Sequence, residues 1–214
     1  MSSSVLVVDY GIGNIRSVCR AFEKCGASVE LSDDPSKIED ADRIVLPGVG
    51  AIAHCMDELN QRGMTEPLTR YTEKERPFLG ICVGMQMMMD ESWEFTRSKC
   101  LGWHSGDVIE VPRKDAKGQY HKIPHVGWSN LDTPSTGIRW EGTILQGIGN
   151  DEPVYFVHSF MANPSDENTR LADTRYNDVN ICAAVTSGAI SGTQFHPEKS
   201  GAVGLRILEN FMAL

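Results

Sequence analysis

The sequence predicts an α/β fold with a central, mostly parallel sheet flanked by helices, followed by a β-rich second half. In the first half, strand signals alternate with helical ones, which is typical of parallel strands joined by crossover helices. The predicted strands there are short, continuous apolar runs, as expected where both faces of a sheet are covered. From residue 106 onward, strand candidates separated by turn residues dominate.

Local patterns define the elements of the first half. Residues 5–8 form an apolar strand, and a helix is expected from about residue 14 to 25 because Ile15, Val18 and Phe22 recur on one face. Further strands are expected at 28–31, 43–46 and 77–81, and further helices at 51–62, 66–74 and 85–91.

The second half contains five strand candidates and one long helix. The strands are expected at 106–111, 122–130, 154–160, 181–185 and 190–195, with turns at 115–118, 132–137 and 163–168. A final helix is expected from 201 to 212, since Leu205, Leu208 and Met212 form one apolar stripe. No tract resembles a linker, so residues 1–214 are predicted to form a single domain.

Composition argues against several classes of function. A net charge of −9 disfavours a nucleic-acid partner, and Arg16, Arg20 and Lys24 fall at the spacing of a solvated helix face. No apolar stretch reaches the ~18 residues that span a bilayer, and the N-terminus lacks the basic region of a signal peptide. We therefore expect a cytoplasmic protein with no membrane partner. The 6 cysteines form no C-x-x-C pair and have no histidines at zinc-finger spacing, so no metal or other cofactor is expected.

One cysteine lies in a pattern that indicates a nucleophile. Cys82 is the centre of a G-x-C-x-G pentapeptide that follows a predicted strand and precedes a predicted helix. This is the form of a nucleophile elbow, in which glycines permit a tight turn and the helix N-terminus favours the thiolate. The amide of Val83 would point at the oxyanion of a tetrahedral intermediate. A buried core thiol in a glycine-flanked turn is the alternative.

A second motif supplies a base for that thiolate. His196 follows the predicted strand 190–195, Pro197 stiffens the turn, and Glu198 is close enough to accept a hydrogen bond from the imidazole. The three residues Cys82, His196 and Glu198 give a nucleophile, a base and a group that orients the base. An isolated H-P-E would more often be a surface histidine beside a solvated glutamate, but the elbow cysteine reverses that preference.

The predicted strand ends bring these motifs together. Residues 9–14, 47–50 and 82–84 all follow parallel strands, whose carboxyl ends meet at one edge of the sheet. The segment Pro47-Gly48-Val49-Gly50 leaves backbone amides exposed, as a second oxyanion donor requires. By itself it would be interpreted as an ordinary turn.

Together, the motifs resemble those of class I, or triad-type, glutamine amidotransferases. In that family the elbow reads G-x-C-x-G-x-Q, as at residues 80–86, and the base motif reads H-P-E, as at 196–198. More narrowly, the chain is similar to the glutaminase subunits of imidazole glycerol phosphate synthase, which acts in histidine biosynthesis. The narrower similarity rests on five segments in family order, at 9–15, 46–50, 80–86, 124–128 and 194–200, and residues 157–160 also resemble a family segment.

The resemblance implies a reaction, a partner and further site residues. L-glutamine would be hydrolysed to glutamate and ammonia. A (βα)8-barrel synthase (cyclase) subunit, forming a heterodimer with this chain, would use the ammonia to make imidazole glycerol phosphate and aminoimidazole carboxamide ribotide. The resemblance assigns glutamine binding to Gly50, Gln86, Glu94 and Ser159, the oxyanion hole to the amides of Val49 and Val83, and partner contacts to Asn14, Trp128 and Lys199.

Departures from the family pattern leave other interpretations open. Val83 stands where Leu is usual, Phe160 where Tyr is usual, and Ser129 where Asn often follows the tryptophan. The nearest alternative is a paralogous subunit that supplies ammonia for amidino groups on surface sugars. A non-catalytic scaffold subunit is another, and the fit of Gln86 and Glu94 to a free amino acid argues against a cysteine peptidase. Without the resemblance, Trp128 would be predicted to be a core aromatic.

Overall fold

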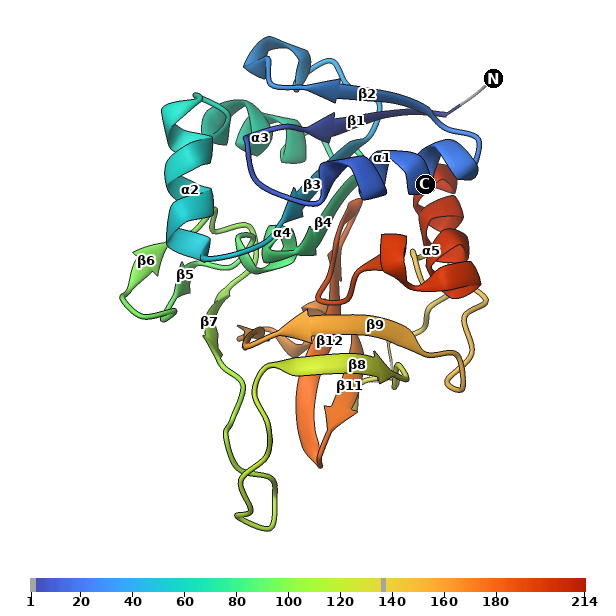
Figure 1. The fold of residues 1–214 in the computed structure, drawn as a ribbon. Coiled ribbons are helices and arrows are strands. Elements are labelled where there is room, and N and C mark those ends of the chain that lie inside the picture. The colour runs from blue at the N-terminus through green and yellow to red at the C-terminus, as the bar shows by residue number, and fades with distance from the viewer. Residues whose placement is uncertain (1–2, 136–137) are drawn as a thin grey trace.

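The computed structural model describes residues 3–135 and 138–214 (Figure 1). Its central feature is a seven-stranded sheet in the order β11-β12-β13-β4-β3-β1-β2. Antiparallel strands form one edge of the sheet, and the remaining five strands are parallel, so the predicted, mostly parallel sheet is confirmed. The parallel strands are β1 (Ser4–Val8), β2 (Ser28–Ser32), β3 (Ile44–Gly48), β4 (Phe78–Cys82) and β13 (Ile190–Thr193), and the antiparallel ones are β11 (Arg170–Tyr176) and β12 (Val179–Ser187).

The register of the parallel strands places their carboxyl ends at one edge. Gly48 at the end of β3 lies opposite Cys82 at the end of β4, and Thr193 at the end of β13 lies opposite Ile81. The segments that follow β1, β3, β4 and β13 therefore leave the sheet side by side, as ligand-binding loops do in open α/β sheets.

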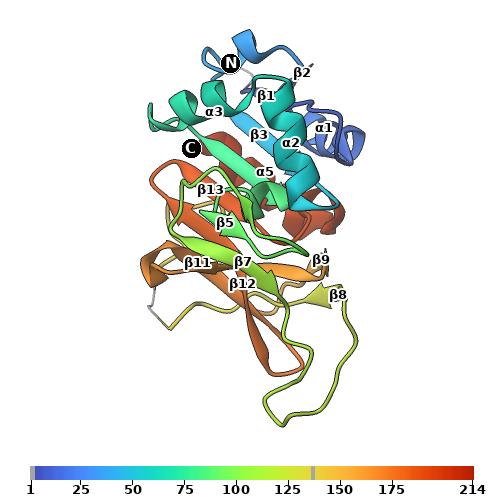
Figure 2. The same ribbon diagram turned by 90° about the vertical axis from the view of Figure 1, so that its left-hand side faces the viewer.

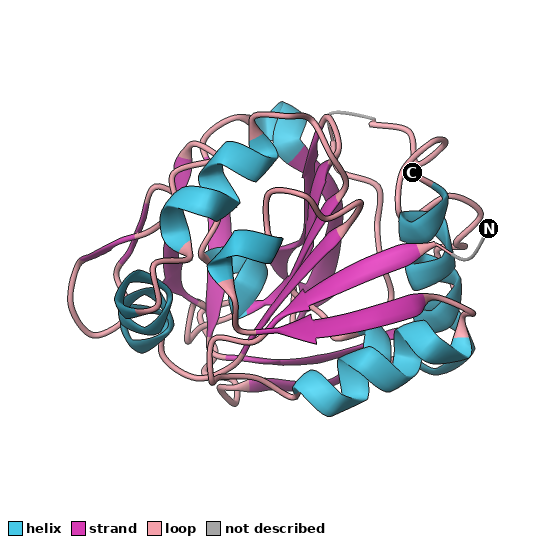
Figure 3. Cartoon of the chain, turned by 90° about the horizontal axis from the view of Figure 1, so that it is seen from above, coloured by secondary structure: helices cyan, strands magenta, loops and turns pink. Residues whose placement is uncertain are grey.

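Helices cover both faces of this sheet. Helices α1 (Ile15–Lys24) and α5 (Gly201–Ala213) pack together, with the rings of Phe22 and Phe211 in edge contact at 6.0 Å. Helices α2 (Ile52–Gln61) and α3 (Thr65–Thr72) lie on the opposite face (Figure 3). Right-handed crossovers account for this arrangement, because β1 to β2 and β3 to β4 run in opposite directions across the sheet.

A smaller β-layer supplies the second half of the fold. A four-stranded sheet has the order β10-β7-β5-β6, and β8 pairs with β9 in a separate ribbon (Figure 2). The loop between β7 and β8 projects away from the rest of the chain in both Figures 1 and 2. These strands are β5 (Glu91–Ser92), β6 (Ser98–Lys99), β7 (Gly106–Glu110), β8 (His125–Ser129), β9 (Val154–His158) and β10 (Phe160–Pro164).

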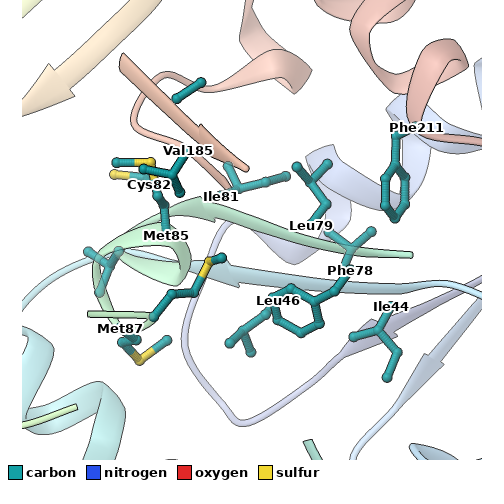
Figure 4. Packing of buried hydrophobic residues seen from close by; sticks show 14 of the residues in the cluster. Ile44, Leu46, Phe78, Leu79, Ile81, Cys82, Met85, Met87, Val185 and Phe211 are labelled. Carbon is teal, nitrogen blue, oxygen red and sulfur yellow. The ribbon is translucent and has the colours of Figure 1, made fainter. Parts of the chain in front are cut away.

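The hydrophobic core reaches the predicted elbow. Figure 4 shows Leu46 on β3 and Phe78, Leu79 and Ile81 on β4 in the cluster that also contains Cys82. The four hydrophobic residues are at most 1 % exposed. Close packing of this kind fixes β3 and β4 against each other, so the loops at their ends start from rigid positions.

The helix expected at 85–91 is wrong in both position and length. Helix α4 spans only Val83–Gln86, and Glu91 already belongs to β5. The carbonyls of Met87, Met88 and Met89 accept hydrogen bonds from the amides of residues 101–104, so they are not available to extend the helix.

Two further expectations about strands need correction. The single strand expected at 154–160 is two strands, because β9 pairs with β8 whereas β10 pairs with β7. Strand β11 was not predicted, since its sequence carries charges that mask the pattern; Arg170 and Asp173 form a buried ion pair within it. The turn expected at 132–137 ends on residues 136–137, which lie outside the described residues. None of the described helices has the length and apolar character needed to cross a membrane.

Candidate active site

Cys82 lies at the sharp junction between β4 and α4. Its backbone has φ 56° and ψ −108°, in the left-handed half of conformational space that non-glycine residues seldom occupy. Such a conformation persists only where the surroundings enforce it, and it is concentrated at functional sites. The strand–turn–helix context predicted for a nucleophile elbow is therefore present.

The two elbow glycines permit a close approach of backbones. A Cβ on Gly84 would lie 2.0 Å from the carbonyl oxygen of Leu46, and a Cβ on Gly80 would lie 2.7 Å from the carbonyl of Gly84. Both distances are far below van der Waals contact, so only glycine fits. The turn that presents Cys82 is thus packed directly against β3.

His196 and Glu198 form the second part of the site. Glu198 lies in a short 3-10 helix, η3 (Pro197–Lys199), directly after His196, and its Oε1 accepts from His196 Nδ1 at 2.8 Å. Their side chains are 3 % and 1 % exposed. The backbone of His196 is also fixed, since its amide donates to the carbonyl of Tyr155 and its carbonyl accepts from Ser200 Oγ. The carboxylate therefore determines the imidazole orientation and leaves Nε2 for another partner.

Electrostatics couple His196 to Cys82. Burial alone would lower the pKa of His196, but the neighbouring Cys82 and Glu198 side chains outweigh burial and raise it to about 9. Within the described part of the chain, His196 Nε2 is buried and has no hydrogen-bond partner. A protonated imidazole beside a cysteine sulfur at neutral pH is the arrangement that activates a thiolate nucleophile.

A cavity of about 570 Å³ opens over these groups. That volume is in the range of sites for small molecules. The predicted site residues that line it are Val49, Gly50, Cys82, Val83, Gln86, Glu94, Ser159, His196 and Lys199. Glu198, which lies behind His196, and the predicted partner-contact residues Asn14 and Trp128 are not among the residues that line it. In the described residues, no group of three His, Cys, Asp or Glu side chains is placed to hold a metal ion.

Comparison with known proteins now identifies the family. Residues 6–214 match the family model described as Glutamine amidotransferase class-I. The chain belongs to the class I glutamine amidotransferases. Cys82, His196 and Glu198 are the residues that the sequence motifs predicted as the nucleophile, the base and the group that orients the base.

Relatives with curated names match this amidotransferase over its whole length. It is 49% identical over 212 residues to "Imidazole glycerol phosphate synthase subunit HisH 1" of Legionella pneumophila (strain Lens), an alignment that covers 99% of this chain and 100% of the relative. It is 45% identical over 208 residues to the HisH subunit of Syntrophotalea carbinolica, covering 97% of this chain and 98% of that one.

Solved structures with low sequence identity share the fold. "Structure of PurLQS from Thermotoga maritima" matches with a TM-score of 0.72 at 19% identity, covering 100% of this chain and 99% of that chain. "Crystal structure of glutamine amidotransferase" matches with a TM-score of 0.71 at 18% identity, covering 98% of this chain and 99% of that chain.

The amidotransferase site contains a glutamine that sequence motifs did not single out. Gln194 Nε2 donates to Cys82 Sγ at 3.7 Å, and Gln194 Oε1 accepts from Gln86 Nε2 at 2.8 Å. Gln86 Nε2 also donates to the carbonyl of Phe160 at 2.8 Å. Gln86, which lines the cavity, thus ties the elbow to Gln194, directly after β13, and to β10. The only sequence signal for Gln194 was its place beside the H-P-E motif.

Glu94 connects the wall of the cavity to helix α2. Its Oε2 accepts from the amide of Ile52 at 2.6 Å, in the first turn of α2. Burial raises the pKa of Glu94, an effect that the Ile52 hydrogen bond partly offsets. This contact holds the loop between β5 and β6 beside residues 49–51. Because Glu94 also lines the cavity, its carboxylate is placed where it can pair with the ammonium group of an amino acid.

An exposed aromatic face adjoins the cavity. Trp128 on β8 is 55% exposed and makes an edge contact with the ring of Tyr155. The Nζ of Lys199 lies over the same Tyr155 ring, 6.0 Å from its centroid. Val126, on the same strand, is 52% exposed. The interpretation of Trp128 as a core aromatic is thus wrong. Asn14 is exposed at the start of α1, where it accepts from Ser17 Oγ.

A buried histidine pair lies beside the site. His158 Nδ1 donates to the carbonyl of Phe160 at 2.9 Å, so its Nε2 accepts from His125 Nδ1 at 3.0 Å. His125 Nε2 then accepts from Ser129 Oγ at 3.1 Å. This chain of bonds uses both rings in their neutral forms. Burial lowers the pKa of each histidine to about 4.

Acid is expected to destabilise the fold through this histidine pair. Unfolded histidines bind protons below about pH 6.5, whereas the folded pair resists protonation down to about pH 4. The stability that the pair contributes is therefore complete above pH 6.5 and is lost as pH falls toward 4. Two such shifts correspond to at most about 5 kcal/mol between pH 7 and pH 4.5, so urea unfolding should show a loss of several kcal/mol from the pair.

Two variants make this prediction specific. His125→Gln should flatten the pH dependence of the unfolding free energy, whatever its effect at pH 7. His54→Gln, at an exposed position on α2, should leave the pH dependence as in wild type. An equal pH dependence in wild type and His125→Gln would contradict the assignment to the pair.

Proposed function

We propose that this chain is the glutaminase subunit of an imidazole glycerol phosphate synthase in histidine biosynthesis, acting in the cytoplasm as one amidotransferase domain over residues 1–214. It hydrolyses L-glutamine to glutamate and delivers the ammonia to a synthase subunit. The observation that carries this proposal is the buried Cys82, His196 and Glu198 set beneath a cavity, in a chain 49% identical over its length to a HisH subunit.

The first chemical step forms a covalent intermediate. The Cys82 thiolate attacks the side-chain carbonyl carbon of glutamine, and the carbonyl oxygen becomes an oxyanion. Val83 opens α4, so its amide has no acceptor within that helix and is available to this oxygen. The amide of Val49, on the neighbouring loop of the cavity wall, is the second donor.

Proton transfers by His196 complete the turnover. Protonated His196 gives its proton to the carboxamide nitrogen as the carbon–nitrogen bond breaks, which releases ammonia and leaves a γ-glutamyl thioester on Cys82. Neutral His196 then takes a proton from water, the hydroxide adds to the thioester, and glutamate leaves as the thiolate reforms. Glu198 holds the imidazole in the tautomer with the proton on Nδ1 throughout.

Polar groups of the cavity wall are proposed to hold the amino-acid end of the substrate. Glu94 is placed for the ammonium group, and Gly50, Gln86 and the backbone around Ser159 are placed for the remaining polar atoms. A free amino acid satisfies these groups, whereas an internal peptide residue lacks the charged ends. This favours a glutaminase over a peptidase.

The synthase partner is proposed to be a (βα)8-barrel subunit that forms a heterodimer with this chain. The exposed side chains of Trp128 and Val126 supply an apolar face, and Lys199 belongs both to this face and to the cavity wall. Asn14 extends the contact at the same edge of the sheet. A closed passage is required chemically, because ammonia released into neutral water becomes ammonium, which is not a nucleophile.

Glutamate release with and without a synthase subunit tests this proposal. We expect glutamate release by the chain alone to be slow. A histidine-pathway synthase subunit carrying its ribonucleotide ligand should raise kcat by ~10²-fold, because partner binding is proposed to complete the alignment of the oxyanion donors. The partner subunit alone and the ligand alone serve as controls.

The outcomes separate the candidate functions. Stimulation by the ligand-bound partner supports the histidine-pathway assignment. Glutamate release that is indifferent to this partner would contradict that assignment and favour the paralogue that supplies ammonia to surface sugars. No glutamate release from a folded complex would overturn the glutaminase proposal and favour a scaffold subunit.

A further inference from the structure

The Gly48–Val49 peptide lies between two peptide units whose carbonyls are held by side chains. The Tyr10 hydroxyl donates to the carbonyl of Pro47 at 2.9 Å, and Cys55 Sγ donates to the carbonyl of Val49 at 3.5 Å. These carbonyls belong to the peptide units immediately before and after the one that contains the Val49 amide. The two units that flank the Val49 amide are therefore each anchored by a buried side chain.

Both donors come from outside the loop and are fully buried. Tyr10 follows β1 and Cys55 lies in α2, and each is 0% exposed. The Tyr10 hydroxyl also lies against the Cys55 thiol. Burial raises the pKa of Tyr10 and raises that of Cys55 to about 11, so both groups keep the proton that they donate at neutral pH.

Packing leaves the intervening glycine little room to move. A Cβ on Gly48 would lie 3.0 Å from the Tyr10 hydroxyl oxygen and 2.8 Å from the amide nitrogen of Gly84. Gly48 is thus pressed between Tyr10 and the start of α4, the helix that begins at Val83. The two proposed oxyanion donors, on Val49 and Val83, consequently share one packed unit.

We propose that Tyr10 and Cys55 are positioning residues for the oxyanion hole: their hydrogen bonds to the carbonyls of Pro47 and Val49 set the orientation of the Val49 amide toward the reacting carbonyl. The inference rests on the proposed glutaminase function. It also gives a role to Tyr10, which lies in the motif at 9–15 and has no other assigned part in the site.

Two substitutions remove the anchors with little change in shape. Tyr10→Phe deletes one hydroxyl and keeps the ring, and Cys55→Ala deletes one thiol. With the synthase partner and its ligand present, each should lower kcat by ~10-fold, a fraction of the ~10²–10³ that loss of a whole oxyanion donor costs. KM for glutamine should stay within about twofold, because the groups proposed to hold the amino-acid end are untouched.

Tyr71→Phe is the matched control. Tyr71 is also 0% exposed, and its hydroxyl donates to the carbonyls of Asp42 and Pro77, at the opposite end of the sheet from Cys82. It should cost thermal stability like Tyr10→Phe while leaving kcat unchanged. If Tyr10→Phe does not fold, Cys55→Ala carries the test.

Alkylation of Cys82 supplies a readout that involves no oxyanion. Iodoacetamide reacts with a thiolate by displacement at carbon, so its rate at the Cys82 peptide, followed by mass spectrometry, reports the nucleophile alone. The rate should be the same in wild type, Tyr10→Phe and Cys55→Ala.

These measurements distinguish the inference from the function on which it rests. A fall in kcat with unchanged KM and alkylation rate supports the positioning role. If wild type is active and Tyr10→Phe and Cys55→Ala match Tyr71→Phe in kcat, the inference is overturned while the glutaminase stands. If alkylation slows in step with kcat, the effect lies on Cys82 and the inference is also overturned. A wild-type complex that releases no glutamate would overturn both.

Discussion

Cys82→Ala is expected to abolish glutamate release, by on the order of 10⁴-fold or more, while the chain still folds and binds its partner. In the proposed mechanism the Cys82 sulfur is the group that forms a covalent bond to the substrate, and no other cysteine lines the cavity among the described residues. Losing one sulfur at a position 5 % exposed removes little packing, so the free energy of unfolding should change little. A large loss of activity with a small loss of stability would identify Cys82 as the nucleophile.

Cys19→Ala is the matched control for this substitution. Cys19 is a partly buried thiol on α1. Its replacement should leave kcat and KM as in wild type. Measurable turnover by Cys82→Ala above about 1% of wild type would contradict the covalent mechanism, because water attack without a nucleophile loses far more than that.

Glu198→Gln is expected to reduce kcat/KM by ~10²–10⁴-fold. The carboxylate accepts a hydrogen bond from His196 Nδ1 at 2.8 Å, and a carboxamide in its place can instead donate to that nitrogen and stabilise the wrong tautomer. Both side chains are nearly inaccessible, so solvent cannot replace the lost contact.

The same variant should change the pH profile in a defined direction. The pKa of His196 is raised to about 9, in part by Glu198, so the imidazolium that protonates the leaving group persists until pH rises through about 9. Wild-type kcat/KM should therefore fall on the alkaline side near that pH. Removing the carboxylate lowers the pKa of His196 and should move this alkaline fall to lower pH.

Glu152→Gln controls for the loss of a glutamate. Glu152 pairs with Arg206 away from the cavity, so its replacement should alter neither the rate nor the pH profile. A Glu198→Gln enzyme with wild-type rate and an unmoved alkaline limb would show that Glu198 does not orient His196.

Local patterns predicted most of the central sheet because its inner parallel strands are buried on both faces. Runs such as those of β1 and β3 contain nothing but core residues over most of their length, so periodicity and length suffice. The incorrect predictions concern segments whose secondary structure depends on contacts with residues far along the chain or on a buried ion pair. The carbonyls of Met87 to Met89 are used by a distant loop, and β11 buries Arg170 against Asp173.

The same distinction applies to the site. Cys82, His196 and Glu198 lie in short motifs whose chemistry depends on neighbours in the sequence, and they were identifiable from the residues alone. Gln194, the histidine pair and the Tyr10 contact with Pro47 depend on partners far along the chain. The exposure of Trp128 likewise follows from the position of β8 in a two-stranded ribbon rather than in the main sheet.

Labelling with an electrophilic glutamine analogue tests the central claim most directly. A diazoketone analogue of L-glutamine, incubated with the chain and its synthase partner, should modify one residue, Cys82, as located by peptide mass spectrometry, and excess L-glutamine should slow the labelling. That result places both the nucleophile and the substrate in the cavity above β4. Modification of a different residue, or labelling of Cys82 that L-glutamine does not slow, would contradict the account.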